Sequence, residues 1–380
     1  MSGQLLGLFA YCVGLIALGA VIGRRVDTST SFFVANRELG PFLLFSTVLA
    51  ANIGAGSTVG AAGLGYRDGL SAWWWVGSAG IGTIVLAVWI GPRIWRVAAD
   101  RDLLTVGDFL EDRYGRSVRA FIAILLWLGT LAILAGQLIA MAEILRVVAG
   151  TPRWVGALVG GAVMTAYFAA GGLVASAWIN LVQLVVLFVG FAIAVPWALA
   201  AAGGWEAVVA AAPPEPAGYL TFMEGGGSGW IYLALLGPAF IVSPGLLQKV
   251  YGAASERAIR RGLVGAGVVL MVFAFAPVLL GMIARSYAPA LAHHEQALPL
   301  VLTEGLPPVF GLLGLAAVLS AEISSADAIL FMLSTSLSKD LYKRFVAPEA
   351  TDAQVLRVAR GAAIAGGALG VGLAVVLPSV

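Results

Sequence analysis

The sequence AEISSADAILFMLSTSLSKDLYKR, residues 321–344, decides the fold. It places two adjacent hydroxyls, Ser324 and Ser325, and an acid, Asp327, in a stretch that is otherwise largely apolar. Polar side chains are costly in a bilayer core, and they persist there mainly where they face a cavity, a partner or an ion. The stretch therefore predicts a membrane helix that carries a polar site.

The composition of the whole chain supports a membrane protein. Of its 380 residues 60% are hydrophobic and only 11% are charged, and the mean hydropathy is +0.96. A soluble domain carries roughly 25% charged residues, so a water-soluble fold is excluded. Cys12 is the only cysteine, which excludes an intramolecular disulfide. We find no phosphate-binding loop, catalytic triad or metal-ligand cluster, so we expect neither an enzyme nor a cofactor.

Apolar runs long enough for membrane helices recur along the chain, which predicts an all-α polytopic protein. Ten segments are expected, at about residues 3–23, 41–66, 71–98, 117–149, 153–170, 174–203, 230–252, 258–285, 308–338 and 355–378.

The basic residues predict the orientation. With the N-terminus outside, only four of the 22 Lys and Arg residues lie on the outer side: Arg67, Arg146, Arg153 and Arg285. Lys249 and the pair Arg24 and Arg25 then belong to the cytoplasmic side, as the positive-inside rule requires. Because no basic residue precedes the first apolar run, we expect that run to be a retained span and not a cleaved signal peptide.

Two of the predicted helices contain helix-breaking sequences. Residues 50–60, AANIGAGSTVG, carry three glycines at mid-span, and residues 237–245 contain Gly-Pro and Ser-Pro-Gly. Gly and Pro also serve packing in membrane helices, so either break alone is ambiguous. Interruptions at corresponding positions of two helix groups instead indicate an inverted repeat with a transport site at the membrane midplane.

This pattern gives a domain plan. An extra N-terminal helix occupies residues 1–30, a first five-helix repeat residues 41–203, an outer loop residues 204–229, and a second repeat residues 230–380. The second repeat lacks its last helix, so we expect a C-terminally truncated form of the complete fold.

Six motifs in order resemble the solute:sodium symporter family, within the leucine-transporter fold. They cover nearly the whole chain and read SFFVANRELGPF, LAANIGAGSTVGAAGLGY, TVGDFLEDRYG, YFAAGGLVASAWINLVQ, LLQKVYGAASERAIRRG and SSADAILFMLSTSLSKDLYKRF.

The resemblance implies a sodium site. It would join backbone carbonyls of Ala50 and Ile53 to a helix face that carries Ala321, Ser324 and Ser325. Residues three and four apart share one helical face, and Na⁺ prefers neutral carbonyl and hydroxyl oxygens. The alternative is that the serines bond back to carbonyls one turn earlier in their own helix.

The chain departs from the family where many members carry an aspartate in a pattern like W-T-D-x-x-Q. Here Asn180 stands at that position, and an amide offers no charge, so a second cation site there is in doubt. Glu322 and Asp327 could supply replacement charge or relay protons, or they could be acids buried for packing.

The substrate site is expected beside the broken helices. The candidates are Asn52, Gly56, Ser57, Thr58 and Gln137. Residues 73–75 are three tryptophans, which could form an aromatic cage but which we interpret as anchors at the membrane interface. We expect no Lys or Arg in mid-membrane, and we expect the charges of residues 105–119 to meet water and lipid headgroups.

The function expected from these features is secondary active transport. Inward sodium movement would drive uptake of a small organic solute by alternating access, with Na⁺ as the coupling ion and no cofactor. The alternatives are a proton-coupled symporter and a membrane sensory module of a longer signalling protein. We expect a multi-pass monomer in the inner membrane of a bacterium, with partners limited to solute, sodium and lipid, and no nucleic acid.

Overall fold

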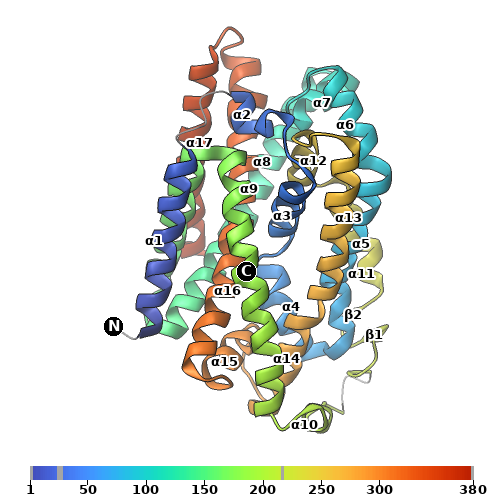
Figure 1. The fold of residues 1–380 in the computed structure, drawn as a ribbon, viewed down its shortest axis with the longest axis vertical. Coiled ribbons are helices and arrows are strands. Elements are labelled where there is room, and N and C mark those ends of the chain that lie inside the picture. The colour runs from blue at the N-terminus through green and yellow to red at the C-terminus, as the bar shows by residue number, and fades with distance from the viewer. Residues whose placement is uncertain (1–2, 24–28, 215–217, 378–380) are drawn as a thin grey trace.

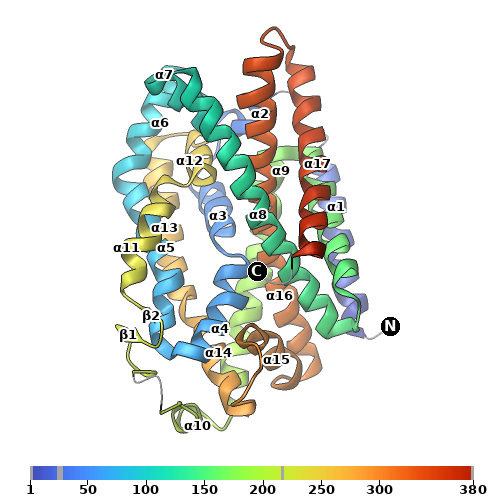
Figure 2. The ribbon, with the colours of Figure 1, turned by 180° about the vertical axis from the view of Figure 1, so that it is seen from behind.

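The computed structural model describes residues 3–23, 29–214 and 218–377, and Arg24 and Arg25 lie outside these ranges. It is an elongated bundle of helices (Figure 1). The helices run mostly along the long axis, with α2 and α7 at the upper end and α10, β1 and β2 at the lower end (Figure 2).

The elements that surround the site have the following bounds. The first part of the chain holds α1 Gly3–Gly23, α2 Ser29–Val34, η1 Ala35–Arg37, α3 Pro41–Asn52, η2 Ala55–Ser57, α4 Val59–Asp68, η3 Gly69–Ala72, α5 Trp73–Val85, η4 Leu86–Ile90, α6 Gly91–Asp100, α7 Val106–Tyr114, α8 Arg116–Ala149 and α9 Arg153–Ala201.

The second part holds α10 Trp205–Ala210, β1 Glu224–Gly225, β2 Ser228–Gly229, α11 Ile231–Val242, α12 Pro244–Tyr251, α13 Glu256–Phe273, α14 Phe275–Tyr287, η5 His294–Gln296, α15 Ala297–Glu304, α16 Pro308–Thr335, η6 Ser336–Val346 and α17 Asp352–Val376. The two short strands pair antiparallel.

Both predicted helix breaks are present. The first apolar segment after α1 and α2 is divided into α3, the 3-10 turn η2 and α4. The second break separates α11 from α12 by a bend of 40° at Ser243. It lies at the Ser-Pro-Gly sequence, whereas Pro238 is accommodated inside α11.

The two segments predicted at 153–170 and 174–203 form one continuous helical element, α9, of 49 residues. At 1.5 Å per residue a straight helix of that length would exceed a bilayer by far. In Figures 1 and 2 the ribbon instead turns over at the upper end of the bundle. The first limb packs on α17, where Gly161 meets Val371, and the second on α16, where Gly190 meets Ala317. The two predicted segments are therefore two limbs of one element, joined by a helical turn.

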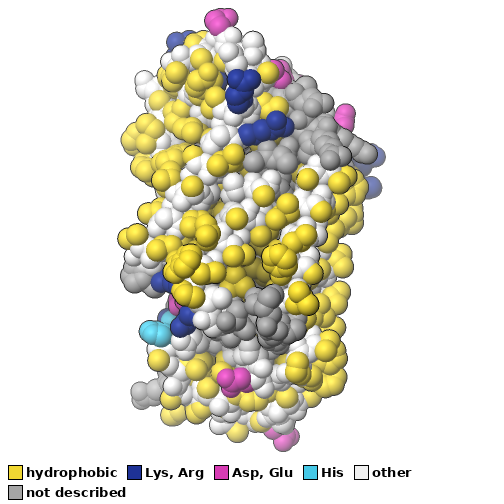
Figure 3. Space-filling view, turned by 90° about the vertical axis from the view of Figure 1, so that its left-hand side faces the viewer, with side chains coloured by type: hydrophobic (Ala, Val, Ile, Leu, Met, Phe, Trp, Pro, Cys, Tyr) yellow, Lys and Arg dark blue, Asp and Glu magenta, His cyan; other side chains and the backbone are white. Residues whose placement is uncertain are grey.

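The surface and the core agree with a membrane protein. Among the described residues six helices are long and apolar enough to span a bilayer, or seven if α11 and α12 count as one bent span. Apolar side chains cover the middle of the face in Figure 3, with several Lys and Arg near its upper end. Helix α16 is the most enclosed of the six, since 78% of its most apolar window is buried.

An ion-pair cluster holds the end of the bundle that carries α7. The charges of residues 105–119 were expected to meet water and headgroups, and the cluster corrects that expectation. Arg119 is 4% exposed, and its guanidinium lies 2.8 Å from Asp108, 2.9 Å from Glu111 and 2.8 Å from Asp340. Partial burial opposes ionisation of Glu111, but Arg344 and Arg119 hold its pKa below the usual value. The cluster ties α7 and α8 to η6.

Candidate ion and solute site

The break after α3 exposes backbone carbonyls. In an unbroken helix the Ala50 carbonyl would accept a hydrogen bond from the Gly54 N–H, four residues on. That N–H donates instead to Ser57 Oγ, at 2.8 Å. The Ile53 carbonyl loses its partner in the same way, because the Ser57 N–H donates to the Gly54 carbonyl at 3.0 Å. The two carbonyls predicted to bind sodium are thus freed by the turn.

The break allows α16 to approach closely. A Cβ added at Gly54 would lie 2.5 Å from both Cβ and Oγ of Ser325 and 2.7 Å from Oε1 of Gln137. Real Cβ atoms do not come so near to other heavy atoms, so only glycine fits at this position. The same amide oxygen of Gln137 accepts a hydrogen bond from the Ala55 N–H at 2.9 Å. Helices α8 and α16 therefore both contact the broken segment.

Ser324 joins the two halves of the predicted sodium site. Its hydroxyl lies 3.3 Å from the Ala50 carbonyl of α3 and 3.0 Å from the Ala321 carbonyl of its own helix. Ser324 thus makes the contact within α16 that a serine bonded back to its own helix would make. It also makes the contact to the break that the sodium site requires. The five residues Ala50, Ile53, Ala321, Ser324 and Ser325 are all buried.

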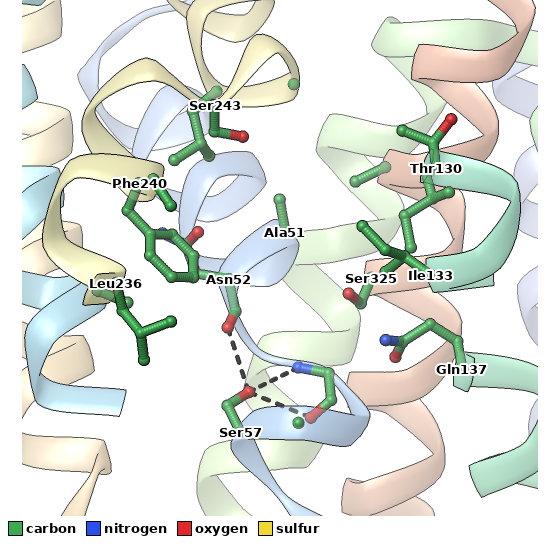
Figure 4. Close-up of a pocket in the computed structure, with 18 of the residues that line it drawn as sticks. Ala51, Asn52, Ser57, Thr130, Ile133, Gln137, Leu236, Phe240, Ser243 and Ser325 are labelled. Carbon is green, nitrogen blue, oxygen red and sulfur yellow. Dashed lines mark hydrogen bonds between the residues drawn. The ribbon is translucent and has the colours of Figure 1, made fainter. Parts of the chain in front are cut away.

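A cavity of about 340 Å³ opens beside this group (Figure 4). The described side chains that line it are uncharged. They come from α3 and η2 in the centre, from α11 and α12 on one side, and from α8 and α16 on the other (Figure 4). Four of the five predicted substrate residues line it: Asn52, Gly56, Ser57 and Gln137.

Thr58 is the exception among the substrate candidates. Its side chain is fully buried and faces away from the cavity toward α16. Its hydroxyl oxygen lies 2.9 Å from the Gly54 carbonyl and 2.9 Å from Oε1 of Glu322. Thr58 is therefore not among the residues that line this cavity.

The three tryptophans do not share one role. Trp75 lines the cavity and donates its indole N–H to the Gly56 carbonyl at 2.8 Å. Trp73 is buried against Trp74 and Phe222, at ring-centroid distances of 5.2 and 5.0 Å. A continuous cage made of all three rings is therefore absent.

Lys249 is the functional candidate that the sequence analysis missed. It was assigned to the cytoplasmic end, yet its side chain is 1% exposed within the bundle. The ammonium donates to Thr47 Oγ1 at 3.1 Å, lies 5.6 Å from the Phe331 ring centroid and interacts electrostatically with Asp327. A basic side chain is therefore enclosed within the bundle, which the sequence analysis did not expect. The available signal was its position only four residues after the Ser-Pro-Gly sequence, inside a predicted membrane segment.

Asn180 belongs to the same group of residues. Its amide Nδ2 lies 3.4 Å from Thr47 Oγ1, and its buried Oδ1 has no hydrogen-bond partner among the described residues. The Asp327 carboxyl group interacts with Ser176, four residues before Asn180 on α9, as well as with Lys249. Asn180 and Lys249 thus share Thr47, and Asp327 is connected to the same group through Ser176 and Lys249.

Comparison with known sequences supports one family. The Sodium:solute symporter family profile matches residues 32–379. The sodium/pantothenate symporter of Escherichia coli K12 is 27% identical over 366 residues, which are 89% of this chain and 72% of the relative. The sodium/pantothenate symporter of Haemophilus influenzae is also 27% identical, over 83% of this chain and 66% of the relative.

A solved structure shows the same fold. The outward-open, substrate-bound Na⁺-coupled sialic acid symporter superimposes with a TM-score of 0.84, covering 98% of this chain and 81% of that one. The sequence identity is 17%, so this likeness establishes the leucine-transporter-like architecture and nothing about the solute.

Proposed function

This chain belongs to the sodium:solute symporter family, and from that premise we propose that Ala50, Ile53, Ala321, Ser324 and Ser325 bind the coupling sodium ion. Membership makes the chain a sodium-coupled solute symporter, an integral multi-pass membrane protein and not an enzyme.

The chemistry of the five residues suits a sodium ion that must be released again. The Ala50 and Ile53 carbonyls lack their helical partners, and Ser324 and Ser325 add hydroxyl oxygens from the facing helix. Na⁺ is a hard cation that takes oxygen ligands, and neutral oxygens bind it less tightly than carboxylates do. The ion would therefore bridge α3 and α16 and still be able to dissociate.

We propose that Ser325 couples sodium binding to solute binding. It belongs to the sodium group and also lines the solute cavity, where its side chain faces the open space (Figure 4). An ion that fixes Ser325 and the break after α3 also fixes Asn52, Gly56 and Ser57 on the same segment. Sodium and solute would therefore raise each other's affinity, as linkage requires.

The cavity favours a small, polar, uncharged or zwitterionic organic solute. Its hydrogen-bonding groups are amides and hydroxyls, from Asn52, Ser57, Gln137 and Ser243, and its apolar surface includes Trp75 and Phe240. A site without a formal charge gains its specificity from hydrogen bonds and shape. We further propose that solute and ion enter from the side of the N-terminus and leave on the side of α7, by alternating access around the two broken helices.

Sodium-dependent thermal stabilisation of the purified chain tests the site, with potassium at equal concentration as the control. We expect a sodium-specific rise in unfolding temperature for the wild type and none for the Ser324→Ala/Ser325→Ala double variant. Ser320→Ala is the matched control, because Ser320 is also buried in α16 but bonds to Tyr11 at 2.7 Å, away from the break. A sodium shift that survives in the double variant would contradict the assignment.

A further inference from the structure

A second, much smaller cavity lies between the solute cavity and the α7 end of the bundle. Its volume is about 20 Å³, against about 340 Å³ for the solute cavity, so it has room for about one water molecule. Its polar lining residues are Gln248 of α12, Thr335 of α16, and Ser336 and Asp340 of η6. Asp340 also belongs to the ion-pair cluster, since its carboxylate lies 2.8 Å from the Arg119 guanidinium.

Met332 stands at the boundary between the two cavities. Among the described residues it alone lines both of them. On α16, Ser325 and Ile329 line the solute cavity, and Thr335 and Ser336 line the smaller one at the start of η6 and just before it. From Ser325 onward these positions are spaced by three or four residues, with Met332 in the middle, so they share one helical face. That face passes first one cavity and then the other.

Helix α8 passes the two cavities in the same order. Leu126 lines the smaller cavity, and Thr130, Ile133 and Gln137 follow along the solute cavity (Figure 4). These four residues are also spaced by three or four positions and form one face of α8. The two cavities therefore lie one behind the other between α8 and α16, on a line that leads toward α7.

The side chain of Met332 packs against the second broken helix. A Cβ added at Gly245 would overlap Met332 Sδ and would lie 3.3 Å from its Cγ, so the thioether occupies the space that the glycine leaves open. Gly245 follows directly on the bend between α11 and α12. Closer to α7, Gln248 donates from Nε2 to Thr335 Oγ1 at 3.1 Å, and both residues are buried. An apolar contact and then a hydrogen bond thus join α12 to α16.

We propose that Met332 is the inner gate residue of the solute pathway, the residue that closes the solute cavity toward α7. Rotation of its side chain away from Gly245 joins the two cavities, and separation of α12 from α16 then widens the passage. Methionine suits this role because its unbranched side chain has three rotatable bonds and adapts to irregular space. The ion pair between Asp340 and Arg119 is the last barrier on this route. The inference rests on the proposed direction of transport, from the N-terminal side to the α7 side.

Labelling of a thiol in the solute cavity tests the gate. Cys12 is the only native cysteine, so the parent chain Cys12→Ser/Thr130→Cys carries a single thiol in that cavity. The reagent is MTSET, a charged, membrane-impermeant methanethiosulfonate, added in KCl to inverted membrane vesicles so that it reaches the protein from the α7 side. We expect Met332→Ala to raise the labelling rate about tenfold, because the truncation removes contacts that hold the closed form. Met332→Leu keeps most of the apolar volume and should stay within about twofold of the parent.

Two controls separate gating from a general loosening of the fold. Met282→Ala truncates a buried methionine of α14 that lines neither cavity, and the introduced thiol should then react at the parent rate. The native thiol of Cys12 is buried in α1 and also lines neither cavity. In a chain that keeps Cys12 as its only cysteine, Met332→Ala should therefore leave the labelling rate unchanged.

The outcomes distinguish this inference from the proposed function. Equal labelling of the cavity thiol in Met332→Ala and the parent would overturn the gate, and so would an equal rise in the labelling of Cys12. NaCl in place of KCl should slow labelling of the parent, because a bound ion holds α3 against α16. If NaCl has no effect on the parent but Met332→Ala still reacts faster, the proposed sodium site fails and the gate stands.

Discussion

Two acids on α16, Glu322 and Asp327, are equally buried but meet different surroundings. Asp327 faces the buried ammonium of Lys249 on α12, and the described groups that Glu322 faces are the neutral ones of the segment after α3. They stand five residues apart on one helix, so their own sequence context is similar. What differs is the element packed opposite each of them.

The difference sets which charge each acid can hold. An ionised carboxylate in the protein interior needs a cation and hydrogen bonds to offset its desolvation. Lys249 gives Asp327 a cation that cannot leave, because it is part of the chain. Glu322 has no such partner among the described residues. The two acids of α16 thus differ in whether a described side chain compensates their charge.

The largest expected effect comes from removing the fixed cation. Lys249→Met leaves Asp327 buried without its countercharge, and we expect a loss of about 3–5 kcal/mol in the free energy of unfolding. The double variant Lys249→Met/Asp327→Asn removes both charges and should recover most of that loss. Denaturant unfolding of the purified proteins measures both. Lys339→Met, at a half-exposed lysine of η6, is the control and should change stability little.

If the two substitutions are additive, with the double variant less stable than either single one, Lys249 and Asp327 do not act as a pair. The comparison with Glu322 would then lose its basis, because neither acid would have a fixed partner.

A second, smaller effect concerns the close approach between Gly54, at the break after α3, and Ser325 of α16, on the Glu322 side of the comparison. Gly54→Ala places a methyl group 2.5 Å from Ser325 Oγ, so α16 and the break must move apart. Overpacking of this kind typically costs about 1–3 kcal/mol, and we expect sodium-dependent stabilisation to disappear as well. Gly56→Ala is the matched control two residues on, since a methyl group there meets only Trp75, at 3.8 Å. Equal sodium shifts in the two variants would show that this contact does not shape the site.

The break after α3 and the serines of α16 that face it lie on the Glu322 side of this comparison. These features could be predicted from the sequence. Three glycines at mid-span weaken a helix wherever they occur, and hydroxyls three and four residues from Ala321 share its face. Local sequence therefore predicted the break, and the family resemblance implied which carbonyls and which serines would face each other there. The structure places Ala50, Ser324 and Ser325 together as these local rules require.

The positions of Lys249, Thr58 and Trp75 could not be predicted, because they depend on which helices pack together. Lys249 was assigned to a helix end because basic residues usually lie there, and local sequence does not show that α12 turns it toward Asp327. The inward direction of Thr58 was missed for the same reason, since η2 changes the helical phase between Ser57 and Thr58. Trp75 was assigned to the interface by composition, and it lines the cavity because α5 packs against α11. Contacts between distant segments set all three positions.

The smallest expected effect distinguishes the two acids most sharply. Glu322→Gln exchanges a neutral acid for an amide of nearly the same shape, which can still bond to Thr58, so stability should change by no more than about 1 kcal/mol. Asp327→Asn leaves Lys249 charged and unpaired, so it should cost about 3–5 kcal/mol at the same pH. Unfolding of both variants near neutral pH in potassium salt measures the contrast. If Glu322 were ionised instead, Glu322→Gln would remove an uncompensated buried charge and stabilise the protein by several kcal/mol. A marked gain in stability would therefore show that Glu322 holds a negative charge beside the proposed sodium site, and the contrast between the two acids would be lost.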